Sequence, residues 1–117
     1  MTRKILCVDD KESITTFFAH VLSAMGHTVS VASDGEEAIA HATAMQFDVV
    51  ITDHQMPQMT GLELVRHLRA TAYPGKIIVY TGALPPGIMK EYEALKVDAI
   101  AMKPMGITEI LALLKKP

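Results

Sequence analysis

The chain has 117 residues, half of them hydrophobic, and a formal net charge of −2 with acidic and basic residues interspersed. This length suits one compact domain over 1–117, since domains of this size bury roughly 60–70% of their unfolded surface. The weak charge gives no support for direct binding of nucleic acid or of an anionic membrane. A single cysteine, Cys7, cannot form an internal disulfide and indicates a buried thiol in a reducing compartment.

The N-terminal segment MTRKILCVDD reaches two acidic residues before the apolar core of a signal peptide could form. No apolar run of the sequence has the length that a bilayer-spanning helix needs. We therefore expect a soluble, cytoplasmic protein with no membrane partner.

Short apolar runs alternate along the chain with segments that have helical periodicity. The runs have the length of strands, and several are rich in β-branched residues, which favour strands. They lie at Ile5–Val8, Thr28–Ala32, Val49–Thr52, Lys76–Tyr80 and Ala99–Met102.

The first helical segment has the strongest amphipathic pattern in the sequence. Its apolar residues recur at i, i+3, i+4, i+7, i+8 and i+11. They are Ile14, Phe17, Phe18, Val21, Leu22 and Met25. Gly26 follows at the position where a helix commonly takes a left-handed C-terminal cap.

Four further helices are predicted after "SDG", after Gly61, after "LPPG" and at the C-terminus. The prolines of "LPPG" suit the start of a helix. The residues expected to face inward are Ala38, Ile39 and Ala42, then Leu64, Val65 and Leu68, then Ile88, Tyr92 and Leu95, and finally Ile107, Ile110, Leu111 and Leu114. Five strands alternating with five helices, with apolar central strands, predict an α/β fold, a doubly wound (βα)5 parallel sheet covered on both faces.

Polar residues follow four of the five predicted strands. Asp9 and Asp10 end the first, Asp53 ends the third, Thr81 the fourth and Lys103 the fifth. The carboxyl ends of parallel strands share one edge of the sheet, where ligands bind at the point at which strand order reverses. We therefore expect these five side chains to converge. The second strand leads into "SDG", an ordinary turn, which fits an outer strand.

Each of these residues has an ordinary structural explanation when it is taken alone. An Asp-Asp pair before a helix is a common N-cap arrangement, Thr-Gly is a turn, and lysine is usually solvated. Three clustered carboxylates, however, raise one another's pKa unless a cation relieves them. The simplest relief is a hard divalent cation with oxygen ligands, supplemented by the lysine.

The polar set lacks the Ser/His or Cys/His pairing that acyl transfer needs, and no Gly-rich nucleotide loop follows the first strand. It can support phosphoryl transfer, in which a metal, a lysine and a hydroxyl neutralise the phosphoryl oxygens. Asp53, the carboxylate that stands alone on its strand, is the candidate nucleophile and would form an acyl phosphate. Asp9 and Asp10 are better placed as metal ligands.

Four motifs, "CVDD", "VITDHQMPQMTGLEL", "VYTGA" and "AMKP", together resemble the receiver domain of two-component response regulators over essentially the whole chain. The resemblance implies a flavodoxin-like sheet with strand order 2-1-3-4-5. It implies that Asp53 accepts a phosphoryl group from a phosphohistidine of a sensor histidine kinase or a histidine phosphotransfer protein. It also implies that Asp9, Asp10, Asp53 and the backbone carbonyl of Gln55 hold Mg²⁺ or Mn²⁺.

The same resemblance implies that Lys103 pairs with the phosphoryl group and that its bond to Pro104 is cis. Thr81 matches the switch hydroxyl, and Gly82 matches the small residue that leaves the phosphoryl pocket open. In family members, phosphorylation draws the threonine inward and reshapes the face made by the fourth helix, the fifth strand and the fifth helix. The expected output is a downstream protein target or a covalently linked output domain, with a homodimer as an open alternative.

The sequence departs from the family pattern at three places. Ile100 stands where the family has a Tyr or Phe that moves behind the threonine, and an isoleucine cannot supply that aromatic ring for the usual output coupling. Lys96-Val97 replaces a "GA" pair and predicts an unusual end of the fourth helix. Lys11 follows the acidic pair and could weaken metal binding, although a solvated side chain is the simpler interpretation.

Two further expectations concern the chemistry of the site. His54, with Gln55 and Ala83, is a candidate for controlling the access of hydrolytic water. We expect a signalling protein that catalyses only its own phosphorylation and dephosphorylation, without an output domain in 1–117. The alternatives are a receiver-like binding module that works without phosphorylation, and a phosphohydrolase, for which the usual DxD motif and substrate cap are missing from the sequence.

Overall fold

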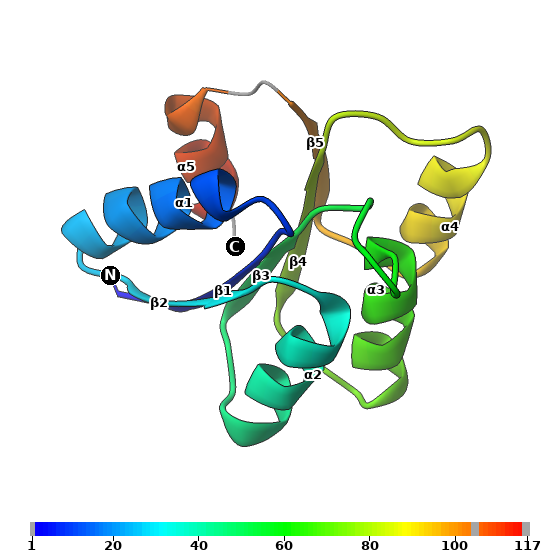
Figure 1. Ribbon diagram of the computed structural model, residues 1–117, viewed down its shortest axis with the longest axis horizontal. Coiled ribbons are helices and arrows are strands. Elements are labelled where there is room, and N and C mark those ends of the chain that lie inside the picture. The colour runs from blue at the N-terminus through cyan, green and yellow to red at the C-terminus, as the bar shows by residue number, and fades with distance from the viewer. Residues whose placement is uncertain (1, 104–105, 116–117) are drawn as a thin grey trace.

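A five-stranded parallel sheet with the order β2-β1-β3-β4-β5 runs through the centre of the molecule (Figure 1). The computed structural model describes residues 2–103 and 106–115, without the side chains of residues 107 and 115. Its strands are β1 (Lys4–Val8), β2 (Thr28–Ala32), β3 (Val49–Thr52), β4 (Lys76–Thr81) and β5 (Ala99–Met102). The predicted α/β fold class and strand order are confirmed, because each strand is followed by a helix and every pair of neighbouring strands is parallel.

The helices lie on both faces of this sheet (Figure 1). They are α1 (Glu12–Ala24), α2 (Gly35–Ala44), α3 (Gly61–Ala70), α4 (Ile88–Ala94) and α5 (Ile107–Lys115). The longest of them, α1, has 13 residues. Within the part of the chain that the structure describes, no helix combines the length and hydrophobicity needed to cross a membrane.

Two hydrophobic cores form because alternate strand residues point to opposite faces of the sheet. The side chains of Ile5, Cys7 and Ile51 pack with Phe18 and Leu22 of α1, as part of the core that also holds α5. The other core joins the opposite sheet face to α2, α3 and α4. Its buried members include Leu6, Val8, Val50, Ala38, Leu64, Val65, Leu68 and Tyr92. Both faces of the central strands are therefore covered, which explains their continuous apolar sequence.

The apolar stripe of α1 is wider than the face that the sheet covers. Phe18 and Leu22 are buried as expected, but Phe17 is 49% exposed and Met25 is 48% exposed. The amphipathic spacing in the sequence does not separate these two residues from the buried ones. Phe17 lies at one edge of the apolar stripe, away from Phe18 and Leu22, and Met25 is the C-cap residue just beyond the last residue of α1.

The end of α4 has the unusual cap that Lys96-Val97 predicts. Lys96 adopts a positive φ of 58°, a left-handed conformation in which glycine is usual. The guanidinium of Arg69 donates to the carbonyl oxygens of Leu95 at 3.0 Å and Lys96 at 2.9 Å. These bonds satisfy carbonyls that the helix itself leaves without partners. Gly26 takes the predicted left-handed cap after α1, with a φ of 93°.

Cys7 offers a direct test of the buried central strand. The residue is 1% exposed, and burial, followed by the nearby charge of Asp9, raises the pKa of its thiol to about 12. We expect native protein at about pH 8 to resist a thiol reagent such as DTNB, because access and the reactive thiolate are both withheld. One equivalent should react after unfolding in guanidinium. Rapid stoichiometric labelling of folded protein would contradict the burial of β1.

Candidate functional site

The carboxyl ends of β1 and β3 form the centre of the candidate site. These two strands are neighbours, and the chain passes from β1 to β2 on one side before β3 adds on the other. This is the point where strand order reverses, the usual ligand position in a doubly wound sheet. Asp9 follows β1 and is 4% exposed, and Asp53 follows β3 and is 6% exposed.

The main chain holds both aspartates in continuation of the strands. The N–H of Asp9 donates to the carbonyl of Ala32 at 3.1 Å, and that of Asp53 donates to the carbonyl of Val8 at 3.0 Å. Each residue is therefore tied to the neighbouring strand just beyond the last ladder pair. This attachment fixes where the two carboxylates can lie.

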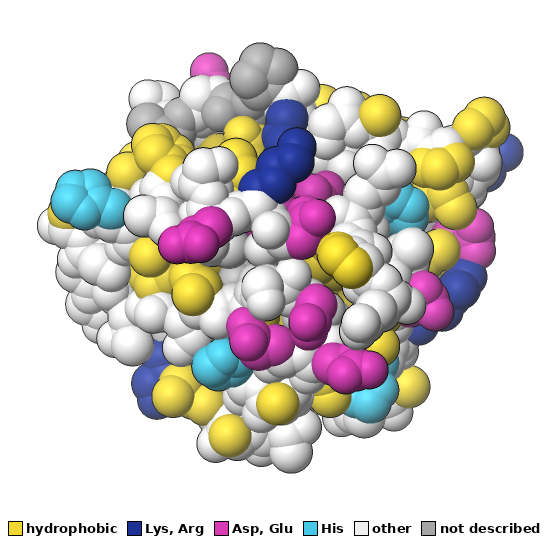
Figure 2. Space-filling model, in the orientation of Figure 1, with side chains coloured by type: hydrophobic (Ala, Val, Ile, Leu, Met, Phe, Trp, Pro, Cys, Tyr) yellow, Lys and Arg dark blue, Asp and Glu magenta, His cyan; other side chains and the backbone are white. Residues whose placement is uncertain are grey.

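Three carboxylates gather at this edge. Ligand oxygens of Asp9, Asp10 and Asp53 all lie within 4.8 Å of one another. The alternative explanation of the acidic pair as an N-cap is wrong, because the N-cap of α1 is Lys11, which makes no side-chain capping bond. Instead Asp9 Oδ1 accepts from the N–H of Lys11 at 2.9 Å. Figure 2 shows acidic side chains gathered on this face of the molecule, with basic side chains beside them.

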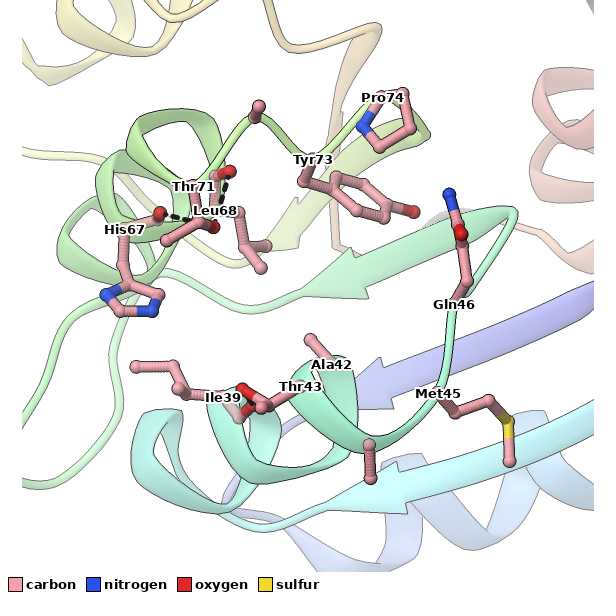
Figure 3. A pocket seen from close by; sticks show the side chains of 12 residues that line it. Ile39, Ala42, Thr43, Met45, Gln46, His67, Leu68, Thr71, Tyr73 and Pro74 are labelled. Carbon is pink, nitrogen blue, oxygen red and sulfur yellow. Dashed lines mark hydrogen bonds between the residues drawn. The ribbon is translucent and has the colours of Figure 1, made fainter.

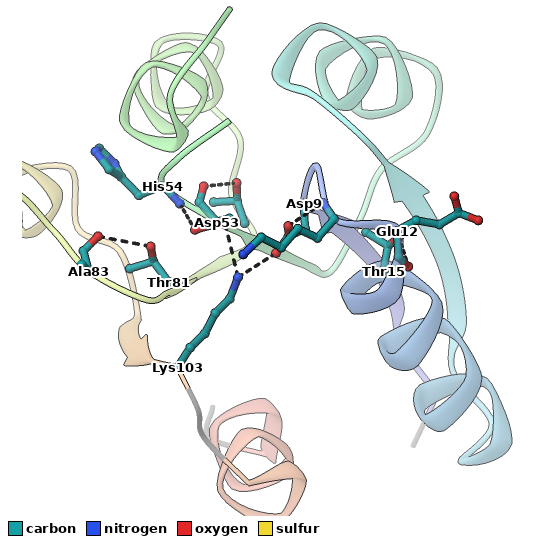
Figure 4. Close-up of polar contacts among 10 residues, drawn as sticks. Asp9, Glu12, Thr15, Asp53, His54, Thr81, Ala83 and Lys103 are labelled. Carbon is teal, nitrogen blue, oxygen red and sulfur yellow. Dashed lines mark hydrogen bonds and ion pairs between the residues drawn. The ribbon is translucent and has the colours of Figure 1, made fainter. Parts of the chain in front are cut away.

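Lys103, which follows β5, reaches two of these carboxylates (Figure 4). Its Nζ donates to Asp9 Oδ2 at 3.0 Å and to Asp53 Oδ2 at 3.3 Å. Its main-chain N–H donates to the carbonyl of Thr81 at 2.7 Å, which anchors the end of β5 to β4. The ammonium also lies 5.4 Å from the centre of the Tyr80 ring, a distance suited to a cation–π contact.

The environment shifts the proton affinity of both members of the Asp9–Lys103 pair. Burial raises the pKa of Asp9, and hydrogen bonds from the Lys11 main chain and from Lys103 offset this rise only in part. Burial alone would lower the pKa of Lys103, but its bond to Asp9 and the charge of Asp53 outweigh burial and raise it. The ammonium therefore stays charged, while burial still disfavours the ionised Asp9 carboxylate, a penalty that a further cation would relieve.

Both carboxylate oxygens of Asp53 have donors. The N–H of His54 donates to Oδ1 at 2.7 Å, and Lys103 donates to Oδ2. The His54 carbonyl in turn accepts from the N–H of Gly61 at 2.8 Å, which closes the loop between β3 and α3. A Cβ at position 61 would clash with the Asp53 carbonyl, so this loop can close only with glycine there. Gln55 lies in the same loop and is exposed.

The remaining predicted residues lie around the Asp53–Lys103 pair. Thr81 is buried, and its hydroxyl lies 3.4 Å from the carbonyl oxygen of Ala83 (Figure 4). Gly82 is exposed, and an added Cβ would meet no atom within 4 Å, so this position borders open space. Ile100 is half-buried and packs against the core of α2, α3 and α4. Pro104 and its peptide bond lie outside the described residues.

Two tyrosines near the site were not predicted as functional residues. Tyr80 packs under Lys103, and Tyr92, expected only as an inward residue of the fourth helix, bonds to the His54 ring at 2.7 Å between Nδ1 and the phenol oxygen. A usable signal existed for Tyr92, because a phenol on the buried face of a helix needs a polar partner. Its partner could not be read from the sequence.

A second hollow lies away from these residues. A cleft of about 510 Å³ separates the C-terminal ends of α2 and α3, and Ile39, Leu68 and Tyr73 are among the residues that line it (Figure 3). The loops at this cleft lead into β3 and β4, so it borders the amino edge of the sheet. It has no aspartate, glutamate or lysine among its lining residues.

Comparison with known proteins agrees with this arrangement. Residues 5–115 match the family model described as the response regulator receiver domain. The chain belongs to this family. A phosphoryl-accepting receiver role follows from that membership.

Curated relatives of this receiver include much longer signalling proteins. The CAI-1 autoinducer sensor kinase/phosphatase CqsS of Vibrio cholerae is 36% identical over 105 residues, which cover 87% of this chain and 15% of CqsS. The aerobic respiration control sensor protein ArcB of Escherichia coli is 31% identical over 115 residues, which cover 96% of this chain and 15% of ArcB. The chain spans 15%, 34% and 47% of three curated relatives that it matches.

Solved receivers have the same fold along almost their whole length. The chemotaxis protein CheY4 of Vibrio cholerae superposes with a TM-score of 0.90 at 34% identity, and the match covers 98% of both chains. The response regulator TrrA of Thermotoga maritima, solved in complex with Mg²⁺-BeF, has a TM-score of 0.85 at 27% identity. That match covers 97% of this chain and 96% of TrrA.

Replacement of Lys103 tests the charge balance of the site. In Lys103→Met, Asp9 and Asp53 lose their shared cationic partner, and we expect the metal-free protein to lose about 1–3 kcal/mol of unfolding free energy. Urea titration in EDTA measures this loss. Lys90→Met, at an exposed position of α4, is the control and should change stability by less than about 0.5 kcal/mol. Equal stability of the two variants would contradict a stabilising role for the Lys103 contacts.

Proposed function

We propose that this receiver takes a phosphoryl group onto Asp53 and passes the signal on by protein–protein contact. The observation that supports Asp53 is its position between two other carboxylates and the Lys103 ammonium, with each of its oxygens already facing a donor. Asp9 has donors of the same kinds, a main-chain N–H and Lys103, so the choice of Asp53 over Asp9 rests on its standing alone after β3 and on its match to the acceptor position of the family motif. Residues 1–117 would act as one receiver unit.

The transfer is an in-line exchange at phosphorus. An oxygen of Asp53 attacks the phosphorus of a phosphohistidine, and the P–N bond breaks as the O–P bond of an acyl phosphate forms. The electron pair of the broken bond returns to the imidazole nitrogen of the donor, which takes up a proton. Lys103 would neutralise charge on the phosphoryl oxygens, and the His54 N–H and the Thr81 hydroxyl would donate to them.

The residues at this edge fit a divalent hard cation. Asp9, Asp10 and Asp53 offer three carboxylates in one small volume, the donor type that Mg²⁺ and Mn²⁺ prefer. We propose the backbone carbonyl of Gln55 as a further protein ligand. When bound, the ion supplies positive charge beside the phosphoryl oxygens. A similar receiver, TrrA of Thermotoga maritima, was solved in complex with Mg²⁺-BeF, which supports the assignment.

We propose that the phosphoryl donor is a sensor histidine kinase or a histidine phosphotransfer protein. Support comes from relatives that are themselves named as sensor proteins, CqsS and ArcB. The downstream partner would be a protein target or a linked output domain, and a second copy of this chain is the alternative partner. The chain's own catalysis would be limited to its phosphorylation and dephosphorylation. The buried free thiol of Cys7 fits a reducing, cytoplasmic location.

A receiver-like module that binds its partner without phosphorylation is the second candidate. It is favoured by Ile100, which has no aromatic ring to move behind Thr81 and instead packs against the hydrophobic core. Partner binding that survives Asp53→Ala would support this candidate over the first.

Phosphorylation by a small donor tests the acceptor. We expect wild-type protein with acetyl phosphate and Mg²⁺ to gain one hydroxylamine-sensitive phosphoryl group, because hydroxylamine cleaves acyl phosphates. Asp53→Asn should gain none, since an amide oxygen is a poor nucleophile. Intact mass spectrometry measures the label. Asp98→Asn, a change at an exposed Asp before β5, is the matched control and should label like wild type. Continued labelling of Asp53→Asn would rule out the assignment.

Metal binding should stabilise the protein through the same cluster. At a Mg²⁺ concentration about ten times Kd, binding adds about 1.4 kcal/mol to the unfolding free energy, measured as a rise in Tm. We expect Asp10→Asn to lose most of this rise. Because it removes one of three repelling charges, the same variant should be slightly more stable than wild type in EDTA. Asp34→Asn, which keeps an N-cap amide oxygen at α2, is the control. A full Mg²⁺ response in Asp10→Asn would exclude Asp10 as a ligand.

A further inference from the structure

A buried hydrogen bond joins α4 to the loop between β3 and α3, residues 53–60, which we call the acceptor loop because it begins with Asp53. The Nδ1 atom of His54 lies 2.7 Å from the Tyr92 hydroxyl, and the two rings meet edge to face with centroids 5.7 Å apart. Tyr92 has no exposed surface, and His54 is 5% exposed. The contact links residues 38 positions apart in the chain. Among the described residues it is the one hydrogen bond between the loop 53–60 and α4.

His54 connects this bond directly to the Asp53 carboxylate. Its N–H donates to Asp53 Oδ1 at 2.7 Å, and its carbonyl accepts from the N–H of Gly61 at 2.8 Å. The imidazole points away from the Asp53 carboxylate (Figure 4) and ends at Tyr92. The main chain of His54 thus follows the acceptor, while its side chain contacts the helix.

Steric contact reinforces the link. A Cβ at Gly61 would lie 2.9 Å from the Tyr92 hydroxyl, so the phenol fits into the corner made by the closed acceptor loop. A shift of that loop would therefore press on Tyr92 as well as stretch its hydrogen bond. Close-packed interiors transmit such displacements, because they have few voids to absorb them.

The phenol also senses the charge of the acceptor. Burial, and next the charge of Asp53, raise the pKa of Tyr92, so its hydroxyl keeps its proton. Phosphorylation of a carboxylate adds about one negative charge to the site at neutral pH. The electrostatic environment of Tyr92 consequently differs between the two states of Asp53.

α4 is the helix most able to respond. It has seven residues, fewer than any other described helix, and its N-cap Gly87 provides no side-chain hydrogen bond. Short helices depend on tertiary contacts, because their own hydrogen bonds contribute little net stability. Tyr92 is the buried residue of α4 and belongs to the core, with Ile88 and Leu95 packed beside it at lower burial.

We propose that the His54–Tyr92 pair carries the phosphorylation state of Asp53 to α4, in place of the aromatic side chain that position 100 lacks. The inference rests on the proposed phosphorylation of Asp53. When Asp53 becomes an acyl phosphate, its phosphorus-bonded oxygen accepts a weaker hydrogen bond, and the His54 N–H donates to a phosphoryl oxygen instead. The His54 ring moves with its main chain, and Tyr92 and α4 follow.

Hydrogen exchange with the acyl-phosphate mimic beryllofluoride and Mg²⁺ tests the proposal. We expect addition of the mimic to change amide exchange across Met89–Leu95 by about twofold or more in the wild type. Tyr92→Phe removes the hydroxyl alone and should reduce this change to less than about half, with acetyl phosphate labelling still within about twofold of wild type.

Tyr73→Phe is the matched control. It removes another hydroxyl, which donates to the Phe47 carbonyl at 2.9 Å near the amino edge of the sheet. This variant should keep the wild-type response of α4. A reduced response in Tyr73→Phe equal to that of Tyr92→Phe would overturn the proposal, because a general loss of stability would then explain both.

NMR chemical shifts of the His54 ring nitrogens provide a second test, which uses only the wild-type protein. Their ¹⁵N shifts should change on addition of beryllofluoride, and unchanged shifts would overturn the proposal even if Tyr92→Phe failed to fold. If acetyl phosphate labels the wild type but α4 of Tyr92→Phe still responds fully to beryllofluoride, the proposed role of the His54–Tyr92 pair would be overturned. The assignment of Asp53 as the acceptor would stand. Wild type that takes no label from acetyl phosphate would overturn the proposed function, and the readout with it.

Discussion

The carboxylates of Asp9, Asp10 and Asp53 lie within 4.8 Å of one another at the carboxyl edge of the sheet, although like charges at this spacing repel. Two of the three are almost fully buried, so water screens them poorly. Packing and main-chain hydrogen bonds of the fold must therefore keep the carboxylates close together. Lys103 neutralises part of the charge, and main-chain donors at Lys11 and His54 take one oxygen of Asp9 and one of Asp53. A cation bound among the three carboxylates would relieve the repulsion that is left over.

This constraint explains several features that look unrelated. The site needs side chains from β1, β3 and β5 at one edge, which a parallel sheet with order β2-β1-β3-β4-β5 provides. Covering both faces with hydrophobic cores makes the central strands rigid, so the carboxylates cannot relax apart. Gly61 lets the acceptor loop close tightly enough for the His54 N–H to reach Asp53. Stability in the two cores thus maintains a locally unfavourable arrangement that serves phosphoryl chemistry.

Accepting a phosphoryl group and transmitting its presence to the rest of the molecule depend on different residues. Position 100 carries an isoleucine that packs into the core, so no ring there is available to follow Thr81. The opposite side of the acceptor loop, by contrast, contains a buried polar pair between His54 and Tyr92. A buried hydrogen bond is directional and costly to break, which makes it a suitable connection between a charge change and a short helix.

Much of this protein could be predicted from its sequence, because local rules decide it. Strand and helix periods determine the (βα)5 alternation, and a residue just past a parallel strand must lie at the carboxyl edge, which is why Asp9, Asp53, Thr81 and Lys103 meet there. Tertiary structure alone decided how far each helix rotates on the sheet. That rotation leaves Phe17 exposed and brings the Tyr92 hydroxyl to His54. Such contacts depend on packing between segments far apart in the chain, and the spacing of residues within one helix does not contain that information.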